Sequence, residues 1–401
     1  MSALAAVSDL IAGPSPVESP HSAPTAVDLQ ALTRLLALTA ARHDAEGSFP
    51  HENFALLQQH GLLALTIGRE HGGQGAGLTR AAEVVSAVAR GCPATALVLV
   101  MQLLQMRQIS QPGSRWPEAL RQSVLRSAVR EGALINALRV EPELGTPARG
   151  GVPATLARRT EEGWRVSGRK IYSTGSEGLT WLLVWVGTDE TPLRTGFVLV
   201  PRHAAGVKIE RTWDSLGLRA SSSHDVVLDD VLVPLENGVD LRPPAQWAAR
   251  EFEVSHWMAV LLGSLYGAVA HNARDWLVDF LQQRRPSALG AALATLPRAQ
   301  EAVGEIEALL QSNRLQLEAA ARDVDAGRAW PPTSTGLLKT SVTRNAIEIV
   351  ERALKLSGNH GTSRANPLER YHRDVLCGRI HTPQEDSALI AAGRAVLVPA
   401  A

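Results

Sequence analysis

The segment Gly378–Asp386, near the end of the chain, holds several side chains that could take part in proton transfer. His381 belongs to the residue type that titrates near neutral pH, so it can act as a donor or as a base. Glu385 is a carboxylate further along the same segment and a potential base. Between them, the hydroxyl of Thr382 is far too weak a base at neutral pH. The chemistry that this segment indicates is acid–base chemistry.

Metal chemistry is not expected. The chain has two cysteines, Cys92 and Cys377, which lie far apart and form no CxxC motif and no Cys/His cluster at metal spacing. A disulfide between them is not expected either, which favours the cytoplasm. No apolar run approaches the ~20 residues of a membrane helix, and the first residues lack the pattern of a secretory signal. We therefore expect a cytoplasmic protein without a metal.

The pattern of apolar residues predicts the elements that must position these side chains. Residues 1–26 are rich in Ala, Ser and Pro and predict a disordered tail. Residues 27–132 have helical periodicity, with Asp28 as the expected cap of the first helix. Residues 133–242 hold short alternating stretches between Gly, Pro and acidic turns, which predict a β domain. Residues 243–401 return to long helical periods, which predict a helical bundle.

The overall composition is that of an ordinary globular protein. Of 401 residues, 45% are hydrophobic and 20% are charged, and the formal net charge is zero. Neither a basic excess nor a polybasic helix indicates binding to nucleic acid or to a membrane surface. We therefore expect a small-molecule substrate.

Five short motifs, in their order along the chain, resemble the acyl-CoA dehydrogenase family. The resemblance covers roughly residues 30–398, and the common order of the motifs makes it specific. It implies an α+β fold with an N-terminal helical domain, a central β domain and a C-terminal four-helix bundle, assembled as a homodimer or homotetramer. The motifs are His71–Gly75, Val140–Thr146, Gly163–Gly175, Leu216–Pro234, and the late turn Leu356–Gly361 with the pair Arg373-Asp374.

The resemblance also implies a flavin, FAD first and FMN as the alternative, whose ring lies between the β domain and the bundle. By position, Val140 and Thr146 would offer backbone or hydroxyl groups to it, and Tyr172 and Thr174 would line its other side. Preorganised donors of this kind stabilise the negative charge of a reduced flavin. Gly358 would let a neighbouring subunit's cofactor pass close to the backbone. The alternatives are ordinary strand packing for Tyr172 and Thr174 and a helix cap for Gly358.

The family's catalytic glutamate is missing from its usual place, where this chain has Thr382. Some members carry the glutamate on the first long helix of the bundle, where Trp257 aligns and Glu253 lies one turn earlier. Glu385 is expected instead to begin the last helix. The remaining candidate is His381, with Gln384 beside it, as a base or a proton donor.

Three functions remain open. One is dehydrogenation of an acyl-CoA or a similar small acyl substrate, with an electron-transfer flavoprotein as partner, which the family's main activity places first. A second is oxygenation of a small organic substrate by a two-component monooxygenase, which receives reduced flavin from a reductase. A third is a flavin-binding scaffold without activity. The polar residues Gln102 and His256 could also face the pocket, and the favoured alternative for each is an ordinary packing or surface position.

Overall fold

The computed structural model describes residues 27–144, 151–247, 252–331 and 333–398. Thr146 and the tail predicted for residues 1–26 lie outside the described residues. Glu253 lies in a described helix, but its side chain is not among those described.

The first third of the described chain is helical, as its periodicity predicts. Asp28 caps the first helix, because its carboxylate accepts hydrogen bonds from the backbone N–H groups of Gln30 and Ala31. Helix α5 is buried along nearly its whole length and fills the centre of the domain. The helices are α2 (Leu29–Glu46), α3 (His51–Gln59), α4 (Leu78–Gly91), α5 (Pro93–Ser110) and α6 (Glu118–Glu131).

The middle of the chain forms one twisted sheet of eight strands in the order β6-β7-β3-β2-β4-β5-β8, with β1 paired to β4. The pairs β1–β4 and β2–β4 are parallel, and the other pairs are antiparallel. Seven of these strands match predicted stretches. The edge strand β8 does not, because its five residues include Asp240 and Arg242 and show little alternation. The strands are β1 (Leu134–Leu138), β2 (Leu156–Arg159), β3 (Trp164–Lys170), β4 (Leu179–Thr188), β5 (Thr195–Pro201), β6 (Val207–Glu210), β7 (Asp225–Val233) and β8 (Gly238–Arg242).

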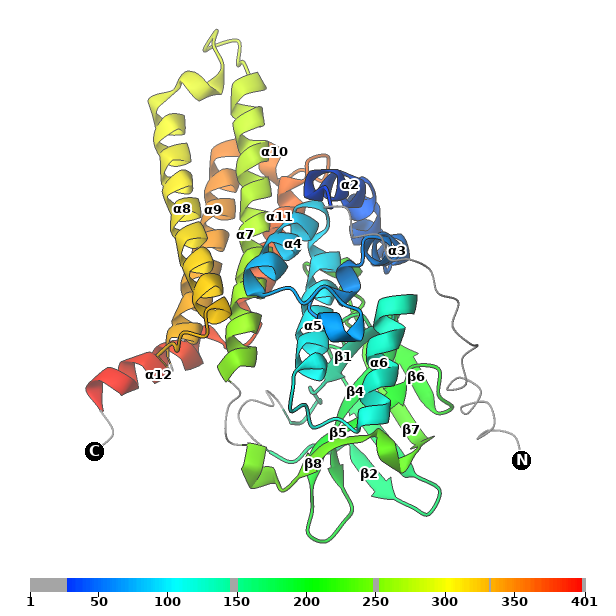
Figure 1. The fold of residues 1–401 in the computed structure, drawn as a ribbon. Coiled ribbons are helices and arrows are strands. Elements are labelled where there is room, and N and C mark those ends of the chain that lie inside the picture. The colour runs from blue at the N-terminus through cyan, green and yellow to red at the C-terminus, as the bar shows by residue number, and fades with distance from the viewer. Residues whose placement is uncertain (1–26, 145–150, 248–251, 332, 399–401) are drawn as a thin grey trace.

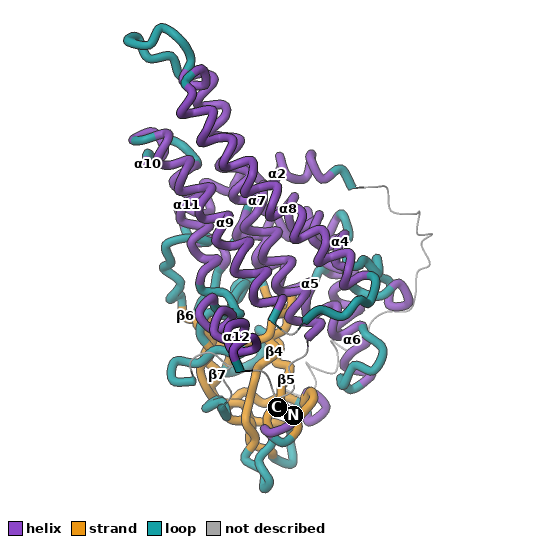
Figure 2. Tube along the Cα trace, turned by 90° about the vertical axis from the view of Figure 1, so that its left-hand side faces the viewer, coloured by secondary structure: helices purple, strands orange, loops and turns teal. Residues whose placement is uncertain are grey.

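Long helices make up the last part of the chain. Figure 1 and Figure 2 show α7, α8 and α9 side by side, with the α7–α8 connection at one end of the molecule and the sheet at the other. The short helix α11 packs against α7 and α9 as the fourth helix of the bundle, and α12 projects from it. The helices are α7 (Phe252–Gln283), α8 (Pro297–Asp325), α9 (Ser334–Ser357), α10 (Asn359–Thr362), α11 (Leu368–Leu376) and α12 (Glu385–Leu397).

The Arg-Asp pair on α11 joins the three parts of the chain. Arg373 forms ion pairs with Asp44 of α2 at 2.6 Å and with Glu369 of its own helix at 2.8 Å. The neighbouring Asp374 is buried and accepts a hydrogen bond from the backbone N–H of Leu218, in the β domain, at 2.6 Å. The contacts with Asp44 and with Leu218 cross domain boundaries, so they fix the orientation of the segment that follows α11.

Asp374 gives this junction a pH dependence. Burial raises the pKa of its carboxyl group from 3.8 to about 6, against the opposing effect of the Leu218 N–H. The pKa of Asp374 is higher in the folded protein than in the unfolded chain, so the protonated carboxyl group stabilises the fold. This contribution is present below about pH 4 and is lost as the pH rises through 6. It amounts to about 3 kcal/mol of the free energy of unfolding.

We therefore expect Asp374→Asn, which cannot titrate, to gain stability relative to wild type between about pH 4 and pH 7. Urea unfolding of both proteins at a fixed protein concentration measures the difference. A difference that stays constant over this range would contradict the raised pKa.

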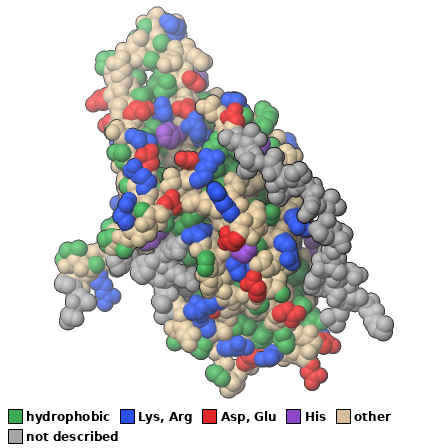
Figure 3. All heavy atoms as spheres, in the orientation of Figure 1, with side chains coloured by type: hydrophobic (Ala, Val, Ile, Leu, Met, Phe, Trp, Pro, Cys, Tyr) green, Lys and Arg blue, Asp and Glu red, His purple; other side chains and the backbone are tan. Residues whose placement is uncertain are grey.

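The surface carries charges of both signs. Figure 3 shows Lys and Arg side chains interspersed with Asp and Glu side chains over the face that it presents. None of the helices in the described part of the chain is long and apolar enough to cross a membrane. Cys92 and Cys377 are both buried free thiols.

Candidate functional site

The β domain brings Val140 and Tyr172 together. The backbone N–H of Ile171 donates to the Val140 carbonyl oxygen at 3.0 Å, which joins the turn after β1 to the turn after β3. Tyr172 has a φ of 54°, in the left-handed region, and its side chain is 61% exposed. Its ring makes an edge contact with Trp213 at a centroid distance of 6.4 Å. A large aromatic ring is therefore presented at the surface beside an open backbone turn.

Thr174 lies in a turn that a serine-rich segment holds in place. Its hydroxyl oxygen accepts a hydrogen bond from Ser223 at 3.1 Å, and its carbonyl oxygen accepts one from the buried Asn136 side chain at 3.0 Å. The N–H of Gly175 donates to the Ser221 carbonyl oxygen at 2.8 Å. This network leaves the Thr174 side chain half-buried at the edge of the turn.

A buried ion pair links the turn after β1 to the end of β3. Lys170, the last residue of β3, places its ammonium 2.5 Å from Glu141 Oε1 and 2.5 Å from the Trp185 carbonyl oxygen. Glu141 also accepts hydrogen bonds from the backbone and hydroxyl of Thr155 at 3.0 and 2.6 Å. Burial lowers the pKa of Lys170 to about 8, so the pair is ionic at neutral pH. Burial opposes ionisation of Glu141, but the hydrogen bonds from Lys170 and Thr155 outweigh it and lower its pKa.

These residues fit a flavin. Tyr172 presents an exposed aromatic ring, against which a planar group can stack. Next to it, the buried Ser173 hydroxyl has no hydrogen-bond partner among the described residues. Val140, Tyr172 and Thr174 are thus the residues that would hold the ring.

On the bundle side, the structure gives His381 a partner that the sequence did not indicate. His381 is half-buried after the 3₁₀ turn η8 (Cys377–Arg379), and its Nδ1 lies 2.7 Å from the hydroxyl of Tyr266 on α7. Tyr266 is fully buried, and burial raises the pKa of its hydroxyl well above the ordinary value. The hydroxyl is therefore protonated at every working pH.

A buried lysine also faces His381. Lys339 on α9 is 1% exposed, and among the described residues no group hydrogen-bonds to its ammonium. Burial lowers its pKa to about 8, while Glu385 acts in the opposite direction. Burial and the positive charge of Lys339 together lower the pKa of His381 to about 4, against the opposing effect of the Cys377 carbonyl. His381 is accordingly neutral at pH 7.

The other residues of the tail lie nearer the surface. Thr382 is exposed, and Gln384 is the half-buried residue that precedes α12. Glu385 begins α12, as predicted, and forms an ion pair with Arg344 at 2.6 Å. The hydrogen bond from Arg344 lowers the pKa of Glu385, so this carboxylate is a weak base.

Contacts link the tail to the β-domain turns. Trp213, which touches Tyr172, donates its indole N–H to the Leu218 carbonyl oxygen at 3.2 Å. Leu218 in turn donates its N–H to Asp374, one helical turn before the segment that carries His381. The two halves of the candidate site are thus held by one continuous set of contacts.

One predicted site residue, Gly358, does not join this group within one chain. Gly358 is the C-cap of α9, with a φ of 57°, nineteen residues after Lys339 on the same helix. At 1.5 Å per residue this is about 29 Å. Glu253 lies in the first turn of α7, one turn before the buried Trp257. Gln102 is a packing residue, because its side chain accepts from the Ile135 N–H and donates to buried carbonyl oxygens.

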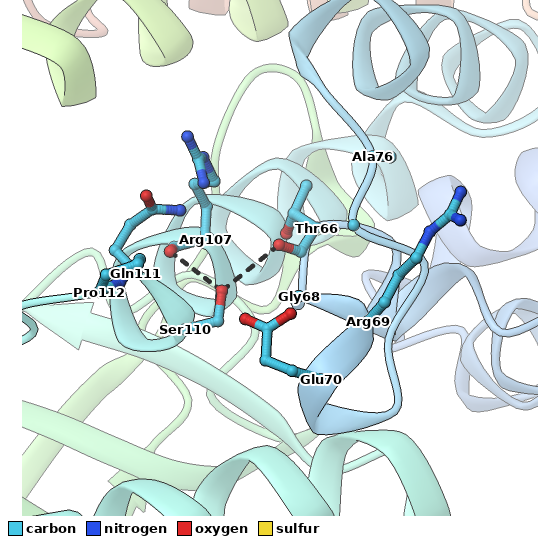
Figure 4. A pocket seen from close by; sticks show the side chains of 10 residues that line it. Thr66, Gly68, Arg69, Glu70, Ala76, Arg107, Ser110, Gln111 and Pro112 are labelled. Atoms are coloured by element: carbon cyan, nitrogen blue, oxygen red, sulfur yellow. Dashed lines mark hydrogen bonds between the residues drawn. The ribbon is translucent and has the colours of Figure 1, made fainter.

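A depression of about 330 Å³ lies on the N-terminal domain, between the end of α5 and the loop before α4. Figure 4 shows Arg69, Glu70 and Arg107 around it, with Ser110 hydrogen-bonded toward Thr66. Arg107, which lines it, places its guanidinium 5.3 Å from the ring centre of Trp257 on α7. None of the predicted site residues is among those that line it. The site proposed below therefore does not include this depression.

Tyr266, Lys339 and Lys170 are the residues that sequence reasoning missed. Tyr266 stands in an apolar stretch of α7 that reads as core, and Lys339 gives no local sign of burial. Lys170 could have been noticed, since lysines are rare in this chain and this one ends a strand beside a flavin-facing motif. No group of His, Cys, Asp and Glu in the described residues is arranged to hold a metal ion.

The fold and this arrangement define an acyl-CoA dehydrogenase-type flavoprotein. Three sequence profiles match in order: the acyl-CoA dehydrogenase N-terminal domain over residues 30–131, the middle domain over 139–231 and the C-terminal domain over 260–385. The chain belongs to the acyl-CoA dehydrogenase family and is a flavin-dependent oxidoreductase.

Its relatives include both dehydrogenases and other flavin enzymes. YdbM of Bacillus subtilis (strain 168), which is named as an acyl-CoA dehydrogenase, is 34% identical over 356 residues, 88% of this chain and 91% of its own. The structure of KijD3 in complex with FMN and dTDP-3-amino-2,3,6-trideoxy-4-keto-3-methyl-D-glucose superposes with a TM-score of 0.79 at 29% identity, covering 92% of each chain. Butyryl-CoA dehydrogenase from Megasphaera elsdenii superposes with a TM-score of 0.80 at 20% identity, over 93% of this chain and 99% of that one. The predicted fold class is confirmed, and the flavin prediction agrees with these relatives.

Proposed function

We propose that this protein is a flavin-dependent monooxygenase that uses reduced flavin and O2 to oxygenate a small organic substrate. The observation that carries the proposal is the pairing of His381 with Tyr266, next to Thr382 in the family's glutamate position. A dehydrogenase needs a carboxylate to remove the α-proton of a thioester. The tail supplies a neutral imidazole in its place.

The carboxylate nearest to Thr382 in the tail does not replace the missing base. Glu385 is engaged by Arg344 at 2.6 Å, and that contact lowers the pKa of Glu385. A carboxylate stabilised as an anion by a guanidinium has little tendency to accept a proton from carbon. This favours a reaction that needs a donor over one that needs a base.

We assign separate roles to the flavin and to the residues around it. When bound, reduced flavin supplies the two electrons with which O2 is cleaved, one oxygen atom entering the substrate and the other leaving as water. The cleavage consumes one proton, which solvent supplies, and we assign to His381 a hydrogen bond toward the departing oxygen. Val140, Tyr172 and Thr174 orient the ring. We assign supply of reduced flavin to a separate reductase, and Gly358 to contact with a neighbouring subunit's cofactor in a homodimer or homotetramer.

Stopped-flow absorbance tests this proposal. Purified protein loaded with reduced FMN or FAD is mixed with oxygenated buffer, and the flavin spectrum is followed. A long-lived species that is neither reduced nor oxidised flavin is expected. Direct return to oxidised flavin would argue against an oxygenase, and failure of the folded oligomer to bind either flavin would argue against both enzyme functions.

Acyl-CoA dehydrogenation is the second candidate, because a relative named for it shares 34% of the aligned residues. In that case Glu253, at the start of α7, would be the base and an electron-transfer flavoprotein the partner. A panel of acyl-CoA substrates with a dye as electron acceptor tests it. Turnover that Glu253→Gln abolishes would establish this reaction over oxygenation.

A further inference from the structure

The burial of Tyr266 decides which group is the donor in its hydrogen bond with His381. A phenol whose hydroxyl is fully buried keeps its proton, and a buried O–H needs an acceptor. Among the described residues, the acceptor within hydrogen-bond distance of this hydroxyl is His381 Nδ1, at 2.7 Å. A ring nitrogen that accepts a hydrogen bond carries no proton of its own, so the proton of the neutral imidazole lies on Nε2.

Lys339 keeps that imidazole neutral. Lys339 is a buried residue of α9, the helix against which α12 packs, and no described residue hydrogen-bonds to its ammonium. The packing is close there: a Cβ added at Gly336 would lie 2.8 Å from Ala388, and one added at Gly378 would lie 2.7 Å from Thr343. A second positive charge on His381 would be repelled by this ammonium.

We propose that Tyr266 and Lys339 are positioning residues that hold His381 as a neutral imidazole with its proton on Nε2, a fixed hydrogen-bond donor. The proposal rests on the oxygenase function only for the use of that donor. A histidine in an ordinary environment would be partly protonated near neutral pH, and its Nδ1 could then no longer accept the hydrogen bond from Tyr266. The two residues remove that dependence.

The groups that face His381 come from three elements. Tyr266 approaches from α7, Lys339 from α9 and the Cys377 carbonyl from the preceding turn η8. The carbonyl is the one that favours protonation, and it is outweighed. Glu385 of α12 faces Lys339 and favours its charged form. Removing Lys339 therefore leaves the carbonyl to act on His381 without opposition from a charge.

Magic-angle-spinning ¹⁵N NMR of protein labelled only at histidine tests the proposal without any turnover. The His381 signals are assigned by difference from His381→Gln. We expect the Nε2–H tautomer in wild type from about pH 5.5 to pH 8, a mixture of tautomers in Tyr266→Phe, and a protonation midpoint at least about one pH unit higher in Lys339→Met. An Nδ1–H tautomer, or an imidazolium at pH 6.5 in the wild type, would overturn it.

Matched controls exist on the same helices and nearby. Tyr371→Phe removes a phenol hydroxyl from α11, and Lys355→Met removes an exposed charge from the end of α9; neither is expected to move the His381 signals. The wild-type spectrum decides the tautomer even where a variant does not fold. Stopped-flow failure with an unchanged Nε2–H tautomer would refute the oxygenase and leave the positioning assignment standing, whereas the reverse result would refute the positioning alone.

Discussion

Replacing His381 by glutamine is expected to shorten the lifetime of the oxygen-derived flavin species by about 100-fold, within the range that a positioned acid or donor contributes. The neutral imidazole donates a hydrogen bond from a position that its contact with Tyr266 fixes. Glutamine keeps a polar side chain of similar length but not the ring geometry that places this donor. Binding of the flavin itself should change little, since Val140, Tyr172 and Thr174 belong to the β domain.

Stopped-flow traces at 4 °C measure the lifetime, and fluorescence quenching measures the dissociation constant of the flavin. His203→Gln, at an exposed position between β5 and β6, is the matched control and should leave both unchanged. A His381→Gln protein whose traces equal the wild type would remove His381 from the reaction. Equal loss of flavin affinity and lifetime would show that the residue supports the fold of the site and not the chemistry.

The order of the helical domain, the β domain and the helical bundle could be predicted, because each has its own spacing of apolar residues along the sequence. Long helical periods of apolar residues predicted α7, α8 and α9, and Asp28 predicted the start of α2. By contrast, α11 was not predicted, because it has only nine residues and follows Pro367. So short an element carries too few apolar positions to establish a period, and tertiary contacts such as Arg373–Asp44 hold it in place.

The candidate site could be predicted only in part, for a related reason. His381 stands in a short motif whose position relative to Arg373-Asp374 can be counted along the chain. Its partner Tyr266 is 115 residues away, and the contact depends on how α7 packs beside the tail. A single sequence identifies residue types that can do chemistry, but it does not say which buried group will fix their protonation.

Lys170→Met is expected to lower the free energy of unfolding by about 3–5 kcal/mol, because it leaves Glu141 buried without its positive partner. This is a large share of the roughly 5–15 kcal/mol that a folded domain has. The ammonium lies 2.5 Å from Glu141 and 2.5 Å from the Trp185 carbonyl oxygen, and the lysine is 0% exposed, so water cannot take its place. Urea unfolding at a fixed protein concentration measures the loss.

The same change should weaken flavin binding, since Lys170 ends β3 two residues before Tyr172, and Glu141 follows Val140 directly. Lys208→Met is the control, because its ammonium is exposed and lies 3.4 Å from Glu210; it should alter stability by less than about 0.5 kcal/mol. The double variant Lys170→Met/Glu141→Gln removes the unpaired charge as well. The double variant should therefore lose less free energy of unfolding than the sum of the losses in the two single variants. Additive losses would mean that the two side chains act independently, and that the ion pair does not hold the flavin-facing turns together.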